Sequence, residues 1–143
     1  MPSKTYFGAL LFAASTAAMA AAPVSYPILD QSADALMNHA SAKAIWAELV
    51  PPALGVRMAM LYPTSRFGFV SQVEGGVNAA KVCVVTARAM LMTRQGKSFA
   101  FPPIKSASAF DAVANATPQQ CKDLASAKLK EAAGVVAASL VAK

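Results

Sequence analysis

The sequence has few of the side chains from which catalytic sites are built. His39 is the only histidine, and the seven carboxylates are dispersed along the chain rather than paired. No G-x-S-x-G nucleophile turn is present, and Gly75-Gly76 lacks the following G-K-[ST] of a phosphate-binding loop. We therefore expect a protein that is not an enzyme and that holds no cofactor. A small hydrolase built around His39 is the enzymatic alternative, because distant residues can complete such a site.

Long apolar runs and runs of like charge are also missing. After residue 20 no segment approaches the ~18 uninterrupted apolar residues that a membrane-spanning helix requires, so we expect no transmembrane segment in the mature chain. The cations are scattered and are not interleaved with clustered aromatics, which disfavours binding to nucleic acid. The net charge of +6 instead suggests an anionic protein or an envelope surface as partner.

The first twenty residues have the layout of a secretory signal peptide. Lys4 is their single charge, an apolar stretch follows it, and Ala18-Met19-Ala20 has the A-x-A form of a cleavage site. We predict cleavage between Ala20 and Ala21 and a periplasmic or secreted protein. An uncleaved N-terminal anchor helix is the alternative. Residues 21–143 are long enough to form one small domain.

The two cysteines, Cys83 and Cys121, are far apart in the sequence. In an exported chain, two cysteines most simply form one disulfide bond. A redox-active thiol is the competing interpretation, but it usually requires closely spaced cysteines such as C-x-x-C, which this chain lacks. We therefore predict a structural disulfide.

Turn residues divide the middle of the chain into three predicted strands. Side chains alternate in character over residues 66–74, and Gly75-Gly76 begins a turn. A long strand follows over residues 81–93, and a short third strand covers residues 98–101. Pro102-Pro103 should end this strand and mark it as a sheet edge. The pattern predicts a three-stranded antiparallel meander.

Alternation also sorts the side chains of the long strand onto two faces. One face has small side chains in its middle, which would let a helix pack closely; it comprises Cys83, Val85, Ala87, Ala89 and Leu91. The other face mixes apolar and polar side chains; it comprises Val82, Val84, Thr86, Arg88, Met90 and Met92.

The clearest helix signal lies near the C-terminus. Thr117 can cap a helix, Pro118 suits the first helical position, and Gln120 stands where a capping box needs its second member. We predict a helix from here to about Leu140. Its buried stripe would comprise Cys121, Ala125, Leu129, Ala132, Val136 and Leu140. The preceding residues, 104–116, read as a surface connection anchored by Phe110.

Earlier in the chain, apolar residues at helical spacing predict one or two N-terminal helices between residues 30 and 62. Pro51-Pro52 should end the first of them, because residues that precede proline avoid helical geometry. We expect these helices on the other face of the sheet or at its edge. The fold class predicted is α+β, a small antiparallel sheet packed against a C-terminal helix.

The function predicted from these features is an exported, non-enzymatic binding protein. In size and compartment it is similar to exported inhibitors and immunity proteins. The candidate partner surface comprises Thr86, Arg88, Arg94 and Lys97, where cations approach the sheet face and the hairpin tip. A periplasmic Cu(I)-binding protein is the alternative, because thioethers are soft ligands. Its candidate ligands are Met58, Met60, Met90 and Met92.

Overall fold

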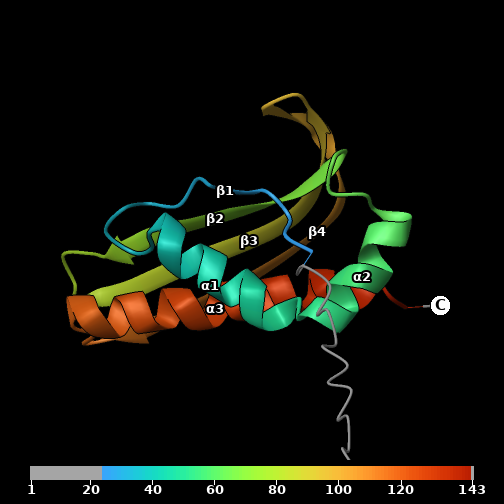
Figure 1. The fold of residues 1–143 in the computed structure, drawn as a ribbon. Coiled ribbons are helices and arrows are strands. Elements are labelled where there is room, and N and C mark those ends of the chain that lie inside the picture. Colours follow the sequence, from blue (N-terminus) through green and yellow to red (C-terminus); the bar gives the residue numbers. More distant parts are fainter. Residues whose placement is uncertain (1–23, 143) are drawn as a thin grey trace, which may run out of the picture.

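A computed structural model describes residues 24–142 of the chain (Figure 1). The predicted signal peptide and its cleavage site lie outside these residues. The elements are, in chain order, β1 (Ile28–Asp30), α1 (His39–Leu49), α2 (Pro52–Leu61), β2 (Phe67–Val77), β3 (Val82–Gln95), β4 (Ser98–Ala114) and α3 (Pro118–Ser139). The α+β class and the C-terminal helix are confirmed.

The sheet has four strands in the order β1-β2-β3-β4 and is mixed rather than purely antiparallel. β2, β3 and β4 form the predicted antiparallel meander, whereas β1 runs parallel to β2, with Ile28 opposite Phe69. The prediction of three strands was therefore wrong. Three residues after Pro27 are too few to show a period of two, and their pairing depends on the free edge of β2.

β4 is much longer than predicted. Pro102-Pro103 do not end it, and the strand continues through Ala114, so the expected surface connection over residues 104–116 is wrong in most of its length. The register shifts by a bulge opposite β3, where Leu91 pairs with Lys105 and Thr93 with Ala100. The unpaired residues of a bulge at a sheet edge can include prolines, because no ladder hydrogen bond is needed there.

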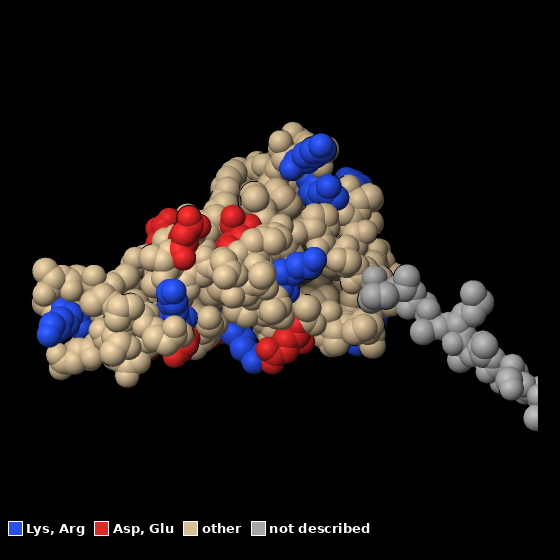
Figure 2. Space-filling model, turned by 60° about the vertical axis from the view of Figure 1, so that its left-hand side comes forward, with Lys and Arg blue, Asp and Glu red and all other residues tan. Residues whose placement is uncertain are grey.

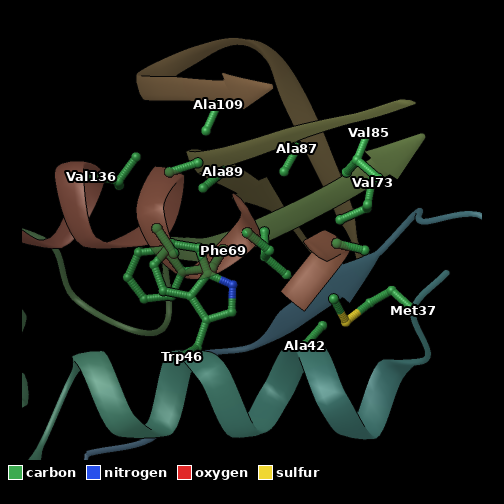
Figure 3. Close-up of a cluster of buried hydrophobic side chains, with 14 of the residues drawn as sticks. Met37, Ala42, Trp46, Phe69, Val73, Val85, Ala87, Ala89, Ala109 and Val136 are labelled. Atoms are coloured by element: carbon green, nitrogen blue, oxygen red, sulfur yellow. The ribbon is translucent and has the colours of Figure 1, made fainter. Parts of the chain in front are cut away.

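The helices α1 and α3 pack against the same face of the sheet, which corrects the expected position of the N-terminal helices. Trp46 of α1 stacks on Phe69 of β2, with ring centroids 4.0 Å apart. Phe69 is opposite Leu91 in the register, and directly opposed residues share a face, so α1 lies on the face that α3 covers. Figure 3 shows Trp46 reaching from α1 toward the small side chains of β3 and toward Val136 of α3.

The predicted contact between β3 and α3 is confirmed in detail. The predicted helix stripe is buried, and so are the five small or apolar side chains of β3 that face it. Cys83 and Cys121 form a disulfide whose Cα atoms are 5.6 Å apart. The bond is compatible with an extracellular or periplasmic location. Thr117 Oγ1 accepts a hydrogen bond from Gln120 N at 3.2 Å, and Gln120 Oε1 accepts one from Thr117 N at 2.8 Å, as a capping box requires.

Within residues 24–142 no single helix is both long and apolar enough to cross a membrane. Taken together, α1 and α2 have the length and composition of a membrane-spanning segment, but the two helices are bent by 88° at their junction.

Candidate binding surface

The side of the sheet opposite α3, which we call the open face, is not covered by α1 or α3. On β3 its side chains alternate with the buried ones, and Val84, Thr86 and Arg88 are exposed. The register places Phe110 of β4 beside Thr86 and Ser108 beside Arg88. Phe110 is 79 % exposed and points away from α3, so it is not the buried anchor that was predicted. This face therefore presents polar and aromatic side chains on a rigid sheet.

At one end of the open face the β3–β4 hairpin curls over the sheet, as Figure 1 shows. A hollow of about 310 Å³ lies there. We call it the hairpin hollow; it is lined by Leu29, Gln31, Val70, Met92, Lys97, Ser98, Phe99 and Phe101. Val70 and Met92 are almost fully buried, whereas Phe101 is 77 % exposed at the rim. The hollow thus combines an apolar floor with an exposed aromatic side chain and a lysine.

Phe99 and Gly68 determine the shape of the hollow. Phe99 packs against Val70, Met90 and Met92, which form a small apolar cluster separate from the main core. A Cβ atom at Gly68 would lie 2.7 Å from Phe99 Cε1 and 2.7 Å from the carbonyl oxygen of Pro27. Glycine at position 68 therefore lets the ring of Phe99 lie against the strand and complete the floor of the hollow.

The four residues of the predicted partner surface do not share one environment. Thr86 and Arg88 are exposed in the middle of the open face, and Lys97 is exposed beside the hairpin hollow. Arg94 is half-buried; its Nη1 donates to the carbonyl oxygen of Thr64 at 3.1 Å and its Nη2 to that of Gly96 at 3.2 Å. Arg94 therefore ties the hairpin to the turn before β2, and Arg88 and Lys97 are the better placed of the predicted cations.

Charge is distributed unevenly along the hairpin. From the start of β3 to Phe110 of β4, residues 82–110 contain four lysines and arginines and no aspartate or glutamate. Figure 2 shows basic side chains and no acidic ones at the top of the molecule, where Figure 1 places the β3–β4 hairpin. Acidic side chains lie lower on the same side of the molecule. The hairpin end therefore carries the positive charge that an anionic partner would meet.

The candidate Cu(I) ligands are divided between two sides of the sheet. Met90 and Met92 lie together beneath Phe99, on the open-face side. Met58 is fully buried in the main core on the helix side, and Met60 is 75 % exposed. The structure therefore does not bring three of these sulfurs together. Among the residues that the structure describes, no three His, Cys, Asp or Glu side chains are grouped as a metal site either.

His39, the residue proposed for the hydrolase alternative, is the first residue of α1 and is exposed. It does not line the hairpin hollow. The imidazole of His39 therefore takes no part in this hollow.

Six of the eight residues that line the hollow were not singled out from the sequence, among them Leu29, Phe99 and Phe101. In a regular strand Phe99 and Phe101 would point the same way. The bulge of β4 separates them, so that Phe99 is half-buried and Phe101 projects. The Phe-Ala-Phe-Pro-Pro sequence is the one signal that could have indicated an irregular, aromatic edge.

Compared with protein-family models and with curated proteins, the chain matches neither. The case for its function therefore rests on the open face and the hairpin hollow.

Proposed function

We propose that this protein is an exported, non-enzymatic binding protein that holds an acidic, partly apolar segment of a partner protein on the open face of its sheet. The hairpin hollow carries this proposal. Its apolar floor, at Val70 and Met92, can receive an apolar side chain, and Phe101 can close over it. Binding energy in protein interfaces concentrates where such an anchor enters a desolvated recess.

The cations near the hollow supply the second element of recognition. Lys97 stands at the rim, and Arg88 lies farther along the open face. A segment running along the open face with acidic side chains could contact both, while its apolar residue occupies the hollow. Polar contacts around an apolar centre are the usual anatomy of a protein interface.

A protein partner fits this surface better than a lipid surface does. Phe101 and Phe110 project from this face as membrane-binding side chains do, but the apolar floor of the hollow is recessed, where a single apolar side chain can enter and a bilayer cannot. The hollow, at about 310 Å³, is also at the small end of the range for a small-molecule site, and it is open enough to admit a side chain.

Two features support an exported location for this activity. The Cys83–Cys121 disulfide suits an oxidising compartment. The first twenty residues have the pattern of a signal peptide.

A photo-crosslinking amino acid at Ser98, which lines the hollow, tests the proposal. Mature protein carrying it is added to periplasmic extract of the native host, and the captured protein is identified and purified. We expect one acidic protein that binds the wild type and that is lost with Arg88→Glu plus Lys97→Glu. Phe101→Ser should weaken the same complex, because it removes the aromatic side of the hollow.

Lys122→Glu is the matched control for Lys97→Glu alone, because each variant reverses one charge. Lys122 is exposed on α3, in the layer opposite the open face, and the substitution reverses one charge without touching the hollow. Its binding should equal that of the wild type. Equal loss of binding in Lys122→Glu would show that net charge alone matters and would overturn the proposal. Capture by anionic lipid vesicles without a protein partner would overturn it as well.

A further inference from the structure

The outer edge of β4 is a second unoccupied surface. β4 is the last strand of the sheet, and within residues 24–142 no other strand pairs with its outer edge. Long exposed edges invite pairing with another chain. This edge also carries three exposed apolar side chains, Ile104 at 45 %, Phe110 at 79 % and Val113 at 43 % exposure.

The hydrogen-bonding groups that face outward can be assigned from the sheet. The carbonyl oxygen of Val82 accepts from Asn78 N at 2.9 Å, so the even-numbered residues of β3 direct their backbone groups toward β2. The odd-numbered residues therefore pair with β4, where Cys83 is opposite Val113 and Ala87 opposite Ala109. It follows that even-numbered residues of β4 present their N–H and C=O groups at the free edge, with Ser108 in the middle.

We propose that two copies of this chain pair through this edge as an antiparallel dimer, with the two-fold axis at Ser108. In this register Lys105 is directly opposite Asp111 of the second copy, and the same ion pair recurs on the other side of the axis. The two residues are six positions apart, an even number, so they lie on the same face of β4 and can meet. Between them lie only Ser106, Ala107, Ser108, Ala109 and Phe110, with no proline to interrupt the pairing.

The exposed apolar side chains meet in the same register. Phe110 is opposite Ser106 of the second copy and diagonal to its Ile104, a separation that aromatic side chains can span. Val113 is opposite Pro103 of the second copy. The register that pairs the charges therefore also gives each exposed apolar side chain of β4 after the bulge an apolar neighbour.

Neighbouring registers lack this complementarity. With the axis at Ala107, Asp111 would be opposite Pro103 and Lys105 opposite Ala109. With the axis at Ala109, Lys105 would be opposite Val113. Only the axis at Ser108 places opposite charges directly across from each other.

Such a dimer would have one continuous eight-stranded sheet with α3 of both copies on the same side, because the two-fold axis is perpendicular to the sheet. The hairpin hollow is lined by β1, β2 and the β3–β4 hairpin, and it uses none of residues 104–113. The dimer edge therefore leaves the hairpin hollow free, although Ser108 and Phe110 belong both to this edge and to the open face.

Sedimentation of the mature, disulfide-bonded protein at several concentrations tests the dimer. We expect Lys105→Glu, which replaces two attractive contacts by two repulsive ones, to raise the dimer dissociation constant roughly ten- to hundredfold. Asp111→Lys should do the same. Asp111 also contacts Lys128 at 3.5 Å within one chain, so circular dichroism must show that this variant is folded.

Mixing the two variants gives the sharper result. In a mixed pair, Glu at position 105 of one copy faces Lys at position 111 of the other, and the native Asp111 and Lys105 face each other across the axis. We expect the mixture to form a heterodimer of about wild-type affinity, although each variant alone dimerises roughly ten- to hundredfold more weakly. A wild type that stays monomeric, or variants that dimerise as well as it does, would overturn the proposal.

Cysteine crosslinking locates the axis without reversing any charge. In an antiparallel hydrogen-bonded pair, directly opposed Cα atoms are about 5.5 Å apart, which suits a disulfide. Ser108→Cys should therefore crosslink to itself under mild oxidation. Ser106→Cys is the matched control, because its copies would be about 13 Å apart along the strands. Efficient crosslinking at position 106 but not at position 108 would refute the register.

Discussion

Ser71 is fully buried in the core, and apart from the aromatic residues it is the only buried residue of 24–142 with a polar side chain. Its Oγ accepts a hydrogen bond from Trp46 Nε1 at 2.8 Å, which satisfies the indole N–H between α1 and the sheet. We expect Ser71→Ala to lower the free energy of unfolding by about 1–3 kcal/mol, because the buried N–H would lose its partner. Urea unfolding followed by circular dichroism measures this change.

A double-mutant cycle identifies the cause of that loss. Trp46→Phe removes the donor, so Ser71→Ala should cost clearly less in that background than in the wild type. Equal costs in both backgrounds would show that the hydrogen bond contributes nothing and that Ser71 acts only through its volume.

Tyr26 supplies a prediction about pH. Burial raises the pKa of the Tyr26 phenol above its ordinary value of 10.0, and its hydroxyl donates to the carbonyl oxygen of Tyr62 at 2.7 Å. The unfolded chain then ionises at lower pH than the folded one, so stability is fully present below pH 10.0 and falls as pH rises through the folded pKa.

The lysines are the same in the wild type and in Tyr26→Phe. The difference between the unfolding free energies of the two proteins therefore isolates the contribution of the Tyr26 phenol. Below pH 9 the difference should be constant, at about 1 kcal/mol for the lost hydrogen bond. Above pH 10.0 the wild type should lose stability faster than Tyr26→Phe, so the difference should shrink. A difference that stays constant through this range would contradict the prediction.

At the scale of elements, α3 is the helix whose start is defined most clearly. Thr117 Oγ1 accepts from the backbone of Gln120, as the sequence predicts. We expect Thr117→Ala to lower the free energy of unfolding by about 1 kcal/mol, because an N–H of the first turn loses its acceptor. Thr117→Ser keeps the hydroxyl and should leave the helix start, and the urea midpoint, nearly unchanged. An equal loss in both variants would mean that the threonine methyl group matters instead.

Elements with strong local signals were predicted well, whereas elements defined by their neighbours were not. β3 and α3 show their periods over many residues, and both lie close to the predicted bounds. β1 has three residues and becomes a strand only because β2 offers it an edge. β4 continues beyond two prolines because the bulge and the edge position accommodate them, which local sequence does not reveal.

At the scale of the whole molecule, the disulfide joins β3 to the first turn of α3. The two cysteines are 38 positions apart, and closing a loop of this length removes up to about 4 kcal/mol of unfolded-chain entropy. We expect Cys83→Ala plus Cys121→Ala to lose up to that amount, seen as a lower urea midpoint. Wild type unfolded in the presence of a reductant should match the variant. An unchanged midpoint in both would show that the sheet and helix hold together without the bond.

The candidate site also belongs to this scale. Arg88 and Lys97 could be named from the sequence because exposed cations on a predicted strand and turn are visible in it. Leu29, Val70 and Phe101 could not be grouped, because β1, β2 and the β4 bulge bring them together only after the hairpin has curled over the sheet.

By itself the sequence determined the α+β class, the pairing of Cys83 with Cys121, the two faces of β3 and the cap of α3. Each depends on short-range periodicity or on a simple count of residues. Only the tertiary structure decided that α1 joins α3 on one face, that β1 makes a fourth strand, and that the other face stays open. The physical reason is that a periodic pattern says which side of an element is apolar but not which other element will cover it.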